Sequence, residues 1–289
     1  MSLISLLFAL AAERYLSTSL WQFNEYYQHY NKLFHRFKLA RNSILSHLLF
    51  IIVPVMVCYF LLSVVSDGFL HFVISTLVLI VCFGCVSSRE LYKKYLMSAF
   101  RGETEECEGY YRQLLANKNL PDLGFGQSLI WLNYRYFIAI MLFFMVFGAP
   151  GALCYRLLTK INEETTEDIE DNDSSQLLPT DDVKQWSNRL ELSQHILFWL
   201  DWLPSRLVAF GYMLVGHFSK ALPVWLENLF ELNKSPQYVL VAVAEKSEDF
   251  MIDDDDCTAE PCLLVRLAKR TLLLCLAFIA ILILTGIIN

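Results

Sequence analysis

Four long runs of apolar residues constrain the fold of this chain more than any other feature of its sequence. A helix that crosses a bilayer needs about 20 mostly apolar residues, because the hydrocarbon core is about 30 Å thick and each residue advances the helix by about 1.5 Å. The runs that meet this requirement without an Asp, Glu, Lys or Arg are Ile44–Val65, Phe69–Val86, Tyr136–Tyr155 and Thr271–Ile288. They predict an all-α, polytopic membrane protein with four transmembrane helices.

The composition agrees with a membrane protein and argues against nucleic acid as a partner. Of the 289 residues, 55% are hydrophobic and only 18% are charged, and the net charge of −7 leaves no basic face for a phosphate backbone. The acidic charge gathers at 163–182 and at Asp253–Asp256. We predict one integral membrane domain over residues 1–289, in which 163–182 form an acidic, flexible loop. For Asp253–Asp256, cation binding is the alternative to a simple solvated segment.

A fifth apolar segment, His195–His217, carries Asp201 and Arg206 near its middle. Each ionised side chain at the centre of a spanning helix costs roughly 2.5–3.5 kcal/mol on insertion scales, so these charges need partners or water. On an ideal helix the two point about 140° apart and do not face each other, unless the proline between them kinks the helix. Two interpretations stay open: the charges pair with neighbouring helices, through residues such as Arg135 or Glu13, or they form a ligand site.

Lys and Arg in the short loops predict the orientation of the helices. Both 14–44 and 87–128 are rich in these residues, which favour the cytoplasmic side of a membrane. The third helix then leaves the cytoplasm and places the acidic loop outside. Basic residues also occupy 266–270, and they return to the cytoplasm only if His195–His217 crosses. We therefore predict that this fifth segment crosses or re-enters the membrane with a kink at Pro204.

Two shorter segments predict helices that do not cross. Met1–Ala12 is apolar but lacks a cationic start, which predicts a retained short helix rather than a cleaved signal peptide. Within 21–42, aromatic residues recur every three to four positions and form a stripe on a helix. An interfacial helix on an anionic leaflet fits this stripe, and packing as a core helix against the membrane bundle is the alternative. The stripe consists of Phe23, Tyr26, Tyr27, Tyr30, Phe34 and Phe37.

Motifs for catalysis and for cofactor binding are missing from the sequence. There is no G-x-S-x-G, P-loop, G-x-G-x-x-G or H-E-x-x-H pattern. Cys82 and Cys85 have C-x-x-C spacing, but no second pair at zinc-ligand spacing accompanies them. Cys257 and Cys262 are close enough to form a disulfide if their loop faces an oxidising compartment. We predict no catalytic residue, no metal and no cofactor.

Two motifs resemble a known family of membrane proteins. The third predicted helix ends in Gly148–Arg156, GAPGALCYR, and the fifth segment contains Leu200–Leu207, LDWLPSRL. Together they resemble the AmpE family within the wider CobD/CbiB superfamily of inner-membrane proteins, and AmpE is the closer match. The similarity extends over nearly the whole chain, through Glu13-Arg14 and Gly216–Pro223.

This resemblance implies a function. AmpE proteins are associated with induction of the AmpC β-lactamase, in a locus shared with an amidase that acts on cell-wall fragments. The resemblance therefore implies a multi-pass regulator in a bacterial inner membrane, non-catalytic or of unknown activity, which lies in the lipid bilayer and responds to an anionic ligand derived from cell-wall recycling. The residues expected to line its polar pocket are Glu13, Arg14, Arg135, Arg156, Asp201, Arg206 and His217.

Two other functions stay open. The corrinoid branch of the superfamily is a synthase that joins an aminopropanol-type arm to a corrinoid carboxylate, so a membrane-bound ligase is one alternative. Its asparagine-rich and acidic motif before the third helix is replaced here by Leu129–Arg135, which counts against that activity. The other alternative is an adaptor that binds a cytoplasmic protein through residues 87–128.

Overall fold

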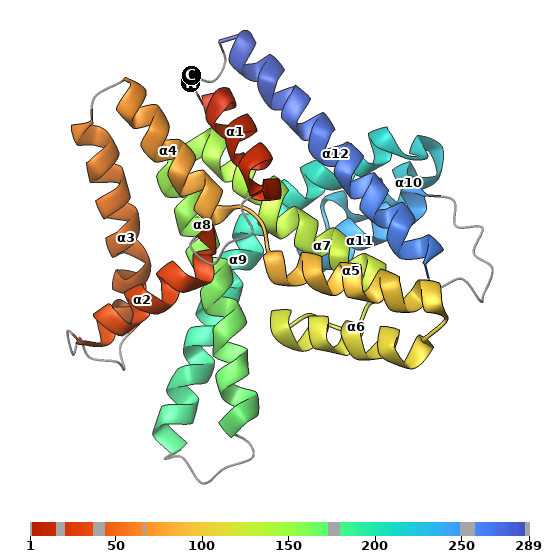
Figure 1. Cartoon of the computed structure of the whole chain (residues 1–289), viewed down its shortest axis with the longest axis horizontal. Helices are drawn as coiled ribbons and strands as arrows, with labels where there is room; N and C mark the ends of the chain where they lie inside the picture. The colour runs from red at the N-terminus through yellow and green to blue at the C-terminus, as the bar shows by residue number, and fades with distance from the viewer. Residues whose placement is uncertain are drawn as a thin grey trace. The chain divides into compact units, whose positions relative to one another are not determined.

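The computed structural model describes residues 2–15, 21–36, 44–65, 68–172, 180–248 and 258–286. Every regular element in these ranges is a helix (Figure 1), which confirms the predicted all-α class. The helices are α1 (Ser2–Tyr15), α2 (Phe23–Arg36), α3 (Ile44–Val64), α4 (Phe69–Cys82), α5 (Val86–Arg101), α6 (Thr104–Lys118), α7 (Phe125–Asn133), the π-helical turn η2 (Tyr134–Ile138), α8 (Ala139–Asn172), α9 (Thr180–Val215), α10 (Phe218–Leu229), α11 (Pro236–Ser247) and α12 (Ala259–Leu284).

Contacts between these helices gather into two compact units. Unit 1 comprises 1–85, 140–197 and 286–289, and unit 2 comprises 86–139 and 198–285. The chain passes from one unit to the other four times, so neither unit is a continuous stretch of sequence. The single membrane domain over 1–289 stays a prediction.

The four predicted transmembrane helices are not confirmed as a set. Two elements are long and apolar enough to cross a bilayer, Phe125–Glu163 and Ala259–Leu284, and they contain the third predicted run and most of the fourth. In α3, the described apolar part is Leu48–Val64, which falls short of that length. The second run, predicted to reach Val86, leaves the helix after Cys82; α4 then spans only about 21 Å. It gives a third candidate only when joined to α5 as a bent pair.

Helix α4 ends where the backbone becomes extended and then left-handed. Phe83 has φ −74 and ψ 148. Gly84 follows with φ +78, a conformation that favours glycine, and an added Cβ there would lie 2.5 Å from an Oε of Glu13. Apolar composition alone did not reveal this stop.

The third predicted span also contains a break. Gly148 has φ 70 and ψ −162, so α8 consists of two helical segments that meet at this residue. The rings of Phe143 and Tyr155 stack with their centroids 4.7 Å apart, although twelve residues of straight helix cover about 18 Å. A Cβ on Gly151 would lie 2.4 Å from Cβ of Phe147 and 2.9 Å from the Phe143 carbonyl oxygen. The chain therefore bends sharply within the GAPG motif.

The acidic segment 163–182 is helical at both ends. Helix α8 continues to Asn172 and α9 begins at Thr180, whereas 173–179 lie outside the described residues. Glutamate has a high helix propensity, which favours the continuation of α8 into the Glu-rich start of this segment. The flexible loop over 163–182 stays a prediction. Asp253–Asp256 and Cys257 also lie outside the described residues, so neither the cation-binding alternative nor the disulfide is addressed.

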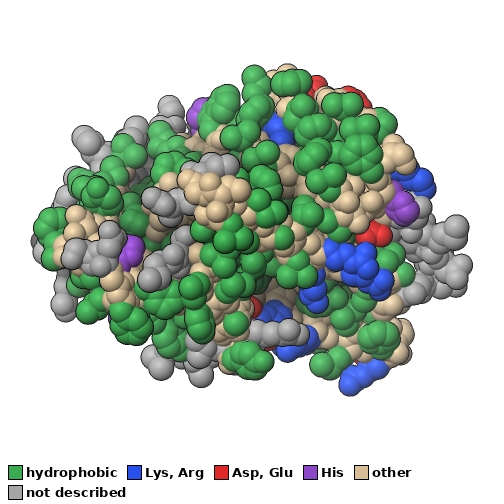
Figure 2. Space-filling view, turned by 90° about the horizontal axis from the view of Figure 1, so that it is seen from above, with side chains coloured by type: hydrophobic (Ala, Val, Ile, Leu, Met, Phe, Trp, Pro, Cys, Tyr) green, Lys and Arg blue, Asp and Glu red, His purple; other side chains and the backbone are tan. Residues whose placement is uncertain are grey.

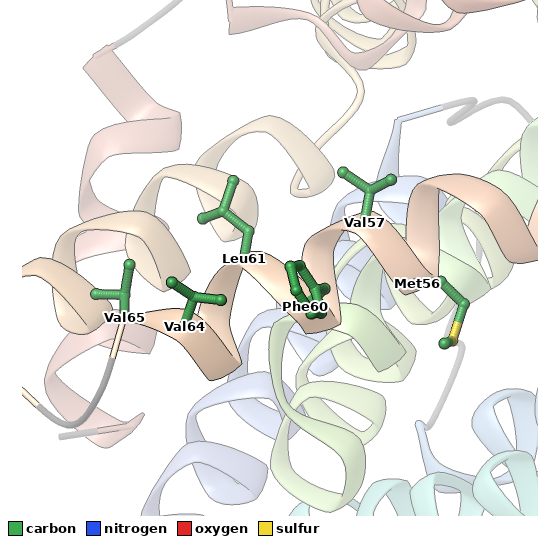
Figure 3. A pocket seen from close by; sticks show the side chains of 6 residues that line it. All are labelled: Met56, Val57, Phe60, Leu61, Val64 and Val65. Carbon is green, nitrogen blue, oxygen red and sulfur yellow. The ribbon is translucent and has the colours of Figure 1, made fainter.

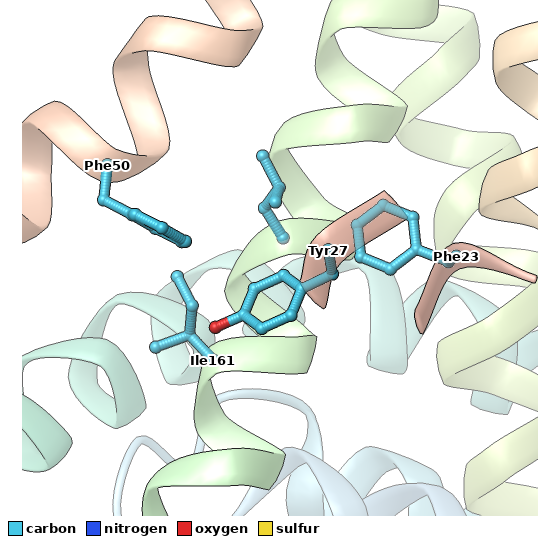
Figure 4. Packing of buried hydrophobic residues seen from close by; sticks show 5 residues of the cluster. Phe23, Tyr27, Phe50 and Ile161 are labelled. Atoms are coloured by element: carbon cyan, nitrogen blue, oxygen red, sulfur yellow. The ribbon is translucent and has the colours of Figure 1, made fainter. Parts of the chain in front are cut away.

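Part of the aromatic stripe of α2 packs inside unit 1 (Figure 4). Phe23, Tyr27, Tyr30 and Phe34 pack with residues of α3 and α8, and the hydroxyl of Tyr30 donates a hydrogen bond to the Phe50 carbonyl at 3.0 Å. Tyr26 is 52% exposed, and Phe37 lies outside the described residues. The four packed side chains agree with the core-packing alternative, and the interfacial helix stays a prediction. The buried cluster consists of Phe23, Tyr27, Phe50, Leu157 and Ile161.

Unit 2 is built around α7 and α11, which are buried along most of their length. Phe125 starts α7 and stacks on Tyr95 of α5 at 3.7 Å between ring centroids. At the end of α9, Gly216 approaches Ser247 so closely that an added Cβ would lie 2.3 Å from the Ser247 carbonyl oxygen. The backbone N–H of His217 donates to that same oxygen at 2.7 Å and satisfies the C-terminal end of α11.

Apolar side chains are exposed on several helices. Figure 2 shows them over most of one face. On α9 they form a single stripe, and on α3 and α12 they occupy much of the helix surface. An exposed apolar surface of this extent is expected where helices contact lipid. The α9 stripe consists of Trp199, Leu203, Leu207, Phe210 and Leu214.

Candidate functional site

Asp201 is the centre of a buried polar cluster in unit 2. Only 2% of its surface is exposed. Its Oδ1 accepts a hydrogen bond from the hydroxyl of Tyr134 at 2.8 Å, and a guanidinium nitrogen of Arg135 lies 3.9 Å from its Oδ2. The charge predicted to need a partner within the membrane therefore has one. Arg135 is among the partners that the sequence offered.

Both partners of Asp201 lie on the π-helical turn η2. A π-helix bonds residue i to i+5, which widens the turn, and such turns occur frequently at functional sites. Arg135 also stands over the indole ring of Trp131, 4.9 Å from its centroid, which favours its charged form in apolar surroundings.

Arg206 is equally buried but has a different role. Its Nε donates to the carbonyl of Leu229 at 2.9 Å, and its two terminal nitrogens donate to the carbonyls of Trp202 at 2.9 Å and Glu231 at 2.6 Å. The guanidinium also lies over the Trp202 ring, at 4.3 Å. Arg206 thus closes the last turn of α10 onto α9, and Asp201 and Arg206 point to different partners, as their 140° separation predicts.

Lys234 also contacts the C-terminal end of α10 and the loop that follows it. Its Nζ lies 2.9 Å from an Oε of Glu231 and donates to Oδ1 of Asn228 at 2.8 Å. The hydrogen bond to Glu231 raises the pKa of Lys234. Trp225 donates to the Arg206 carbonyl at 3.0 Å, so the segment from α10 to Lys234 is tied to α9 by several polar contacts.

Three of the predicted pocket residues belong to unit 1. Glu13 lies against Gly84, in the link that follows α4. Arg156 is 6% exposed, stands over the ring of Phe23 at 5.0 Å, and is near enough to Cys82 to interact electrostatically. The backbone of Arg14 lies in α1, and its side chain is outside the described part of the chain.

The structure therefore brings only some of the predicted pocket residues together. Within unit 2, Asp201 and Arg135 are in contact, Arg206 faces the end of α10, and His217 lies at the junction of α9 and α10. A polar pocket lined by all seven residues stays a prediction. Among the described residues, no group of three or more His, Cys, Asp or Glu side chains is placed to hold a metal ion.

A hollow of about 600 Å³ lies along α3 (Figure 3). Its lining comes from one side of this helix and the residue that follows it, and it is almost wholly apolar. None of the predicted polar residues contributes to it, so it is suited to a lipid chain and not to an anionic ligand. The lining residues are Met56, Val57, Phe60, Leu61, Val64 and Val65.

Tyr134 and Trp202 are site residues that the sequence did not single out. Tyr134 is fully buried and donates a hydrogen bond to Asp201, and Trp202 contributes both a carbonyl and a ring to Arg206. An aromatic residue within an apolar run carries no sign of a polar partner. The position of Tyr134 immediately before Arg135 gave no signal either, because an α-helical projection separates the two.

The sequence matches a known protein family along its whole length. The family model described as "Regulatory signalling modulator protein AmpE" matches residues 1–289. Protein AmpE of Shigella flexneri is 25% identical over 309 residues, which cover 99% of each chain. No solved structure matches. Neither match names the corrinoid synthase, so the wider CobD/CbiB kinship stays a prediction. Because the family model covers the whole chain, this protein belongs to the AmpE family.

Proposed function

We propose that this chain is a multi-pass inner-membrane regulator of AmpC β-lactamase induction, linked to recycling of the cell wall. The match to a family of regulatory signalling modulators along the whole chain supports a regulatory role. The observation that carries the proposal is the buried Asp201, held by Tyr134 and Arg135 on a π-helical turn. A charged side chain in apolar surroundings is typically either part of a functional site or firmly paired with another group.

An anionic fragment of the cell wall is the ligand class that suits Arg135. A guanidinium binds a carboxylate or phosphate through two parallel hydrogen bonds, typically at about 2.7–2.9 Å. The contact between Arg135 and Asp201 is longer, at 3.9 Å, whereas the Tyr134 hydroxyl is at full hydrogen-bond distance. A ligand anion therefore competes with Asp201 for Arg135, while Tyr134 continues to hold Asp201. The exchange of partners alters the packing of α9 on η2 and provides a signal.

In this proposal α9 is the fifth membrane segment. Its exposed side is the apolar stripe that begins at Trp199 and ends at Leu214, whereas Asp201 and Arg206 face the protein. Charges turned inward with apolar side chains outward are the arrangement expected of a membrane helix that carries a site. The stripe covers about 22 Å, which suits a helix that crosses at a polar, locally thinned site or re-enters the membrane.

Complementation tests the proposal. In a bacterium with inducible AmpC and without its own member of this family, the wild-type chain is expected to restore induction by a β-lactam, and Asp201→Asn is expected to abolish it. The matched control is Asp122→Asn, because Asp122 also accepts a hydrogen bond from a tyrosine, Tyr111, but lies at the surface. Both variants are compared at equal protein level in the membrane, measured by immunoblot.

Normal induction by Asp201→Asn at normal protein level would contradict a role for this cluster. Loss of induction in Asp122→Asn as well would show that the effect is not specific to Asp201, so the result for Asp201→Asn would no longer support the proposal. Failure of the wild-type chain to restore induction in this host would contradict the proposed function itself.

A further inference from the structure

We propose that the exposed side of α5 binds anionic phospholipid headgroups at the membrane surface. This side, called here the α5 face, combines three cations with two large apolar side chains. It consists of Lys93, Lys94, Met97, Phe100 and Arg101. The proposal is independent of the ligand suggested for Arg135.

Helical spacing separates the α5 face from the buried side of the same helix. Leu91 and Tyr95 are buried, one turn apart, and Tyr95 stacks on Phe125 of α7. On the opposite side, Met97 is 57% exposed and Phe100 is 76% exposed. Apolar side chains of this size are more stable in an apolar environment than in water, because the transfer of their surface out of water is favourable.

The charge on the two helices of this hairpin is segregated. The α5 face carries Lys93, Lys94 and Arg101, with Glu90 as the one acidic residue on the exposed side of α5. Arg101 lies 3.9 Å from Glu103, which is a long contact, and its own side chain is 68% exposed, so the cation remains accessible to a lipid headgroup.

Two of the three acidic residues of α6 are engaged elsewhere, and the third, Glu105, is exposed. Glu106 accepts a hydrogen bond from Ser98 at 2.8 Å, toward the interior of the hairpin. Glu108 pairs with Arg112 along α6 itself. The α5 face therefore presents net positive charge around an apolar centre, which is the pattern of a helix that lies on an anionic leaflet with its apolar groups inserted.

The covalent chain favours lipid over a protein partner as the occupant. Only 83–85 separate the end of α4, an apolar helix, from the start of α5, a distance of at most about 14 Å in extended chain. With α4 in the bilayer, α5 begins at or near the headgroups whether or not another protein is present. The Lys and Arg of 87–128 also place this segment at the cytoplasmic, anionic leaflet.

Photocrosslinking in lipid nanodiscs tests this proposal. The full-length protein is placed in phosphatidylcholine discs that contain phosphatidylglycerol with a photoactivatable group near the headgroup, and labelled peptides are identified by mass spectrometry. We expect labelling of 93–101. The same probe attached to phosphatidylcholine is expected to label this peptide several-fold less, because the cations select the anionic headgroup.

Charge variants identify the cause of the labelling. The triple change Lys93→Gln, Lys94→Gln and Arg101→Gln is expected to reduce the phosphatidylglycerol labelling of 93–101 by about half or more. The control removes the same number of exposed cations elsewhere in unit 2, and it is expected to leave the labelling unchanged. It consists of Arg112→Gln, Lys246→Gln and Arg266→Gln.

Three outcomes would overturn the proposal. Absence of labelling at 93–101 would place the α5 face in water or against protein. Equal labelling by the two lipids, unaffected by the triple change, would show apolar contact without headgroup recognition. Stronger labelling from a photoactivatable group at the end of the acyl chain would show that α5 crosses the membrane together with α4.

Discussion

Single side chains deal with buried charge in two different ways. Asp201 is held by a hydroxyl and a loosely placed guanidinium, so its environment changes if Arg135 finds another anion. Arg206 donates hydrogen bonds to three backbone carbonyls. Two lie at and just after the end of α10, and the third lies on α9. The first arrangement leaves Arg135 at 3.9 Å from Asp201, farther than a full hydrogen bond. The second joins the C-terminal end of α10 to α9 through direct hydrogen bonds.

Replacing Arg206 by Lys is expected to destabilise the protein by about 2–4 kcal/mol, because an ammonium cannot reach all three carbonyls and leaves buried acceptors unpaired. The free energy of unfolding in mixed micelles measures this loss. The control is Arg112→Lys at an exposed pair on α6, with an expected change below about 0.5 kcal/mol. Equal effects at the two positions would contradict the role given to Arg206.

A double-mutant cycle of Tyr134→Phe and Asp201→Ala is expected to give a coupling energy of about 1–2 kcal/mol, because the hydrogen bond between them is fully buried. The matched cycle uses Tyr111→Phe and Asp122→Ala, a tyrosine–aspartate hydrogen bond of 2.6 Å at the surface. There we expect coupling of no more than about 0.5 kcal/mol, since water replaces the lost partner. Unfolding of the four variants in each cycle supplies both values. Additive effects at Tyr134 and Asp201 would argue against the buried pair.

At the scale of elements, departures from regular helix shape the membrane segments. A straight α8 would carry Phe143 and Tyr155 far apart, whereas the bend at Gly148 stacks their rings. The π-helical turn η2 delivers two consecutive side chains to Asp201. Broken or widened helices in apolar surroundings leave backbone groups without their usual partners, and proteins tolerate this cost where a site depends on it.

Gly148→Ala is expected to cost about 1–2 kcal/mol of stability, since φ +70 is unfavourable for an L residue. Gly151→Ala is expected to cost about 1–3 kcal/mol through its clash with Phe147. Gly109 in α6 is the control, because no atom lies within 4 Å of an added Cβ and alanine there gains about 0.5–1 kcal/mol of helix propensity. Thermal unfolding of the three variants measures these changes. A stabilising effect at Gly148 would show that the helix is straight in the membrane.

For the whole molecule, the number of crossings depends on α9. Among the described residues, Phe125–Glu163 and Ala259–Leu284 are long and apolar enough to cross a membrane. Helix α9 is less apolar, because Asp201 and Arg206 lie within its apolar part. These two charges are buried, whereas the apolar stripe of α9 is exposed.

Fusion of a reporter that is active only outside the cytoplasm locates the segment after α9. At Lys234 we expect low activity, because a crossing α9 returns this residue to the cytoplasm. A fusion after residue 175, in the acidic segment, is expected to be strongly active, and one at Gly109 inactive. Strong activity at Lys234 beside the expected results at the other two positions would contradict the crossing of α9.

The sequence determined what solvent this protein folds in and which family it belongs to. The length of an apolar run and its helical period indicate whether a segment contacts lipid, protein or water. The family is recognised from the LDWLPSRL and GAPGALCYR motifs, each of which is a short continuous stretch of sequence. The sequence also separated Asp201 from Arg206, because that angle follows from helix geometry alone. Tertiary structure decided which partner each charge meets, where the apolar runs bend and which side of α2 is buried. These outcomes depend on a π-helical turn, on two glycines with positive φ and on contacts between residues distant in the chain, none of which the periodicity of one segment encodes.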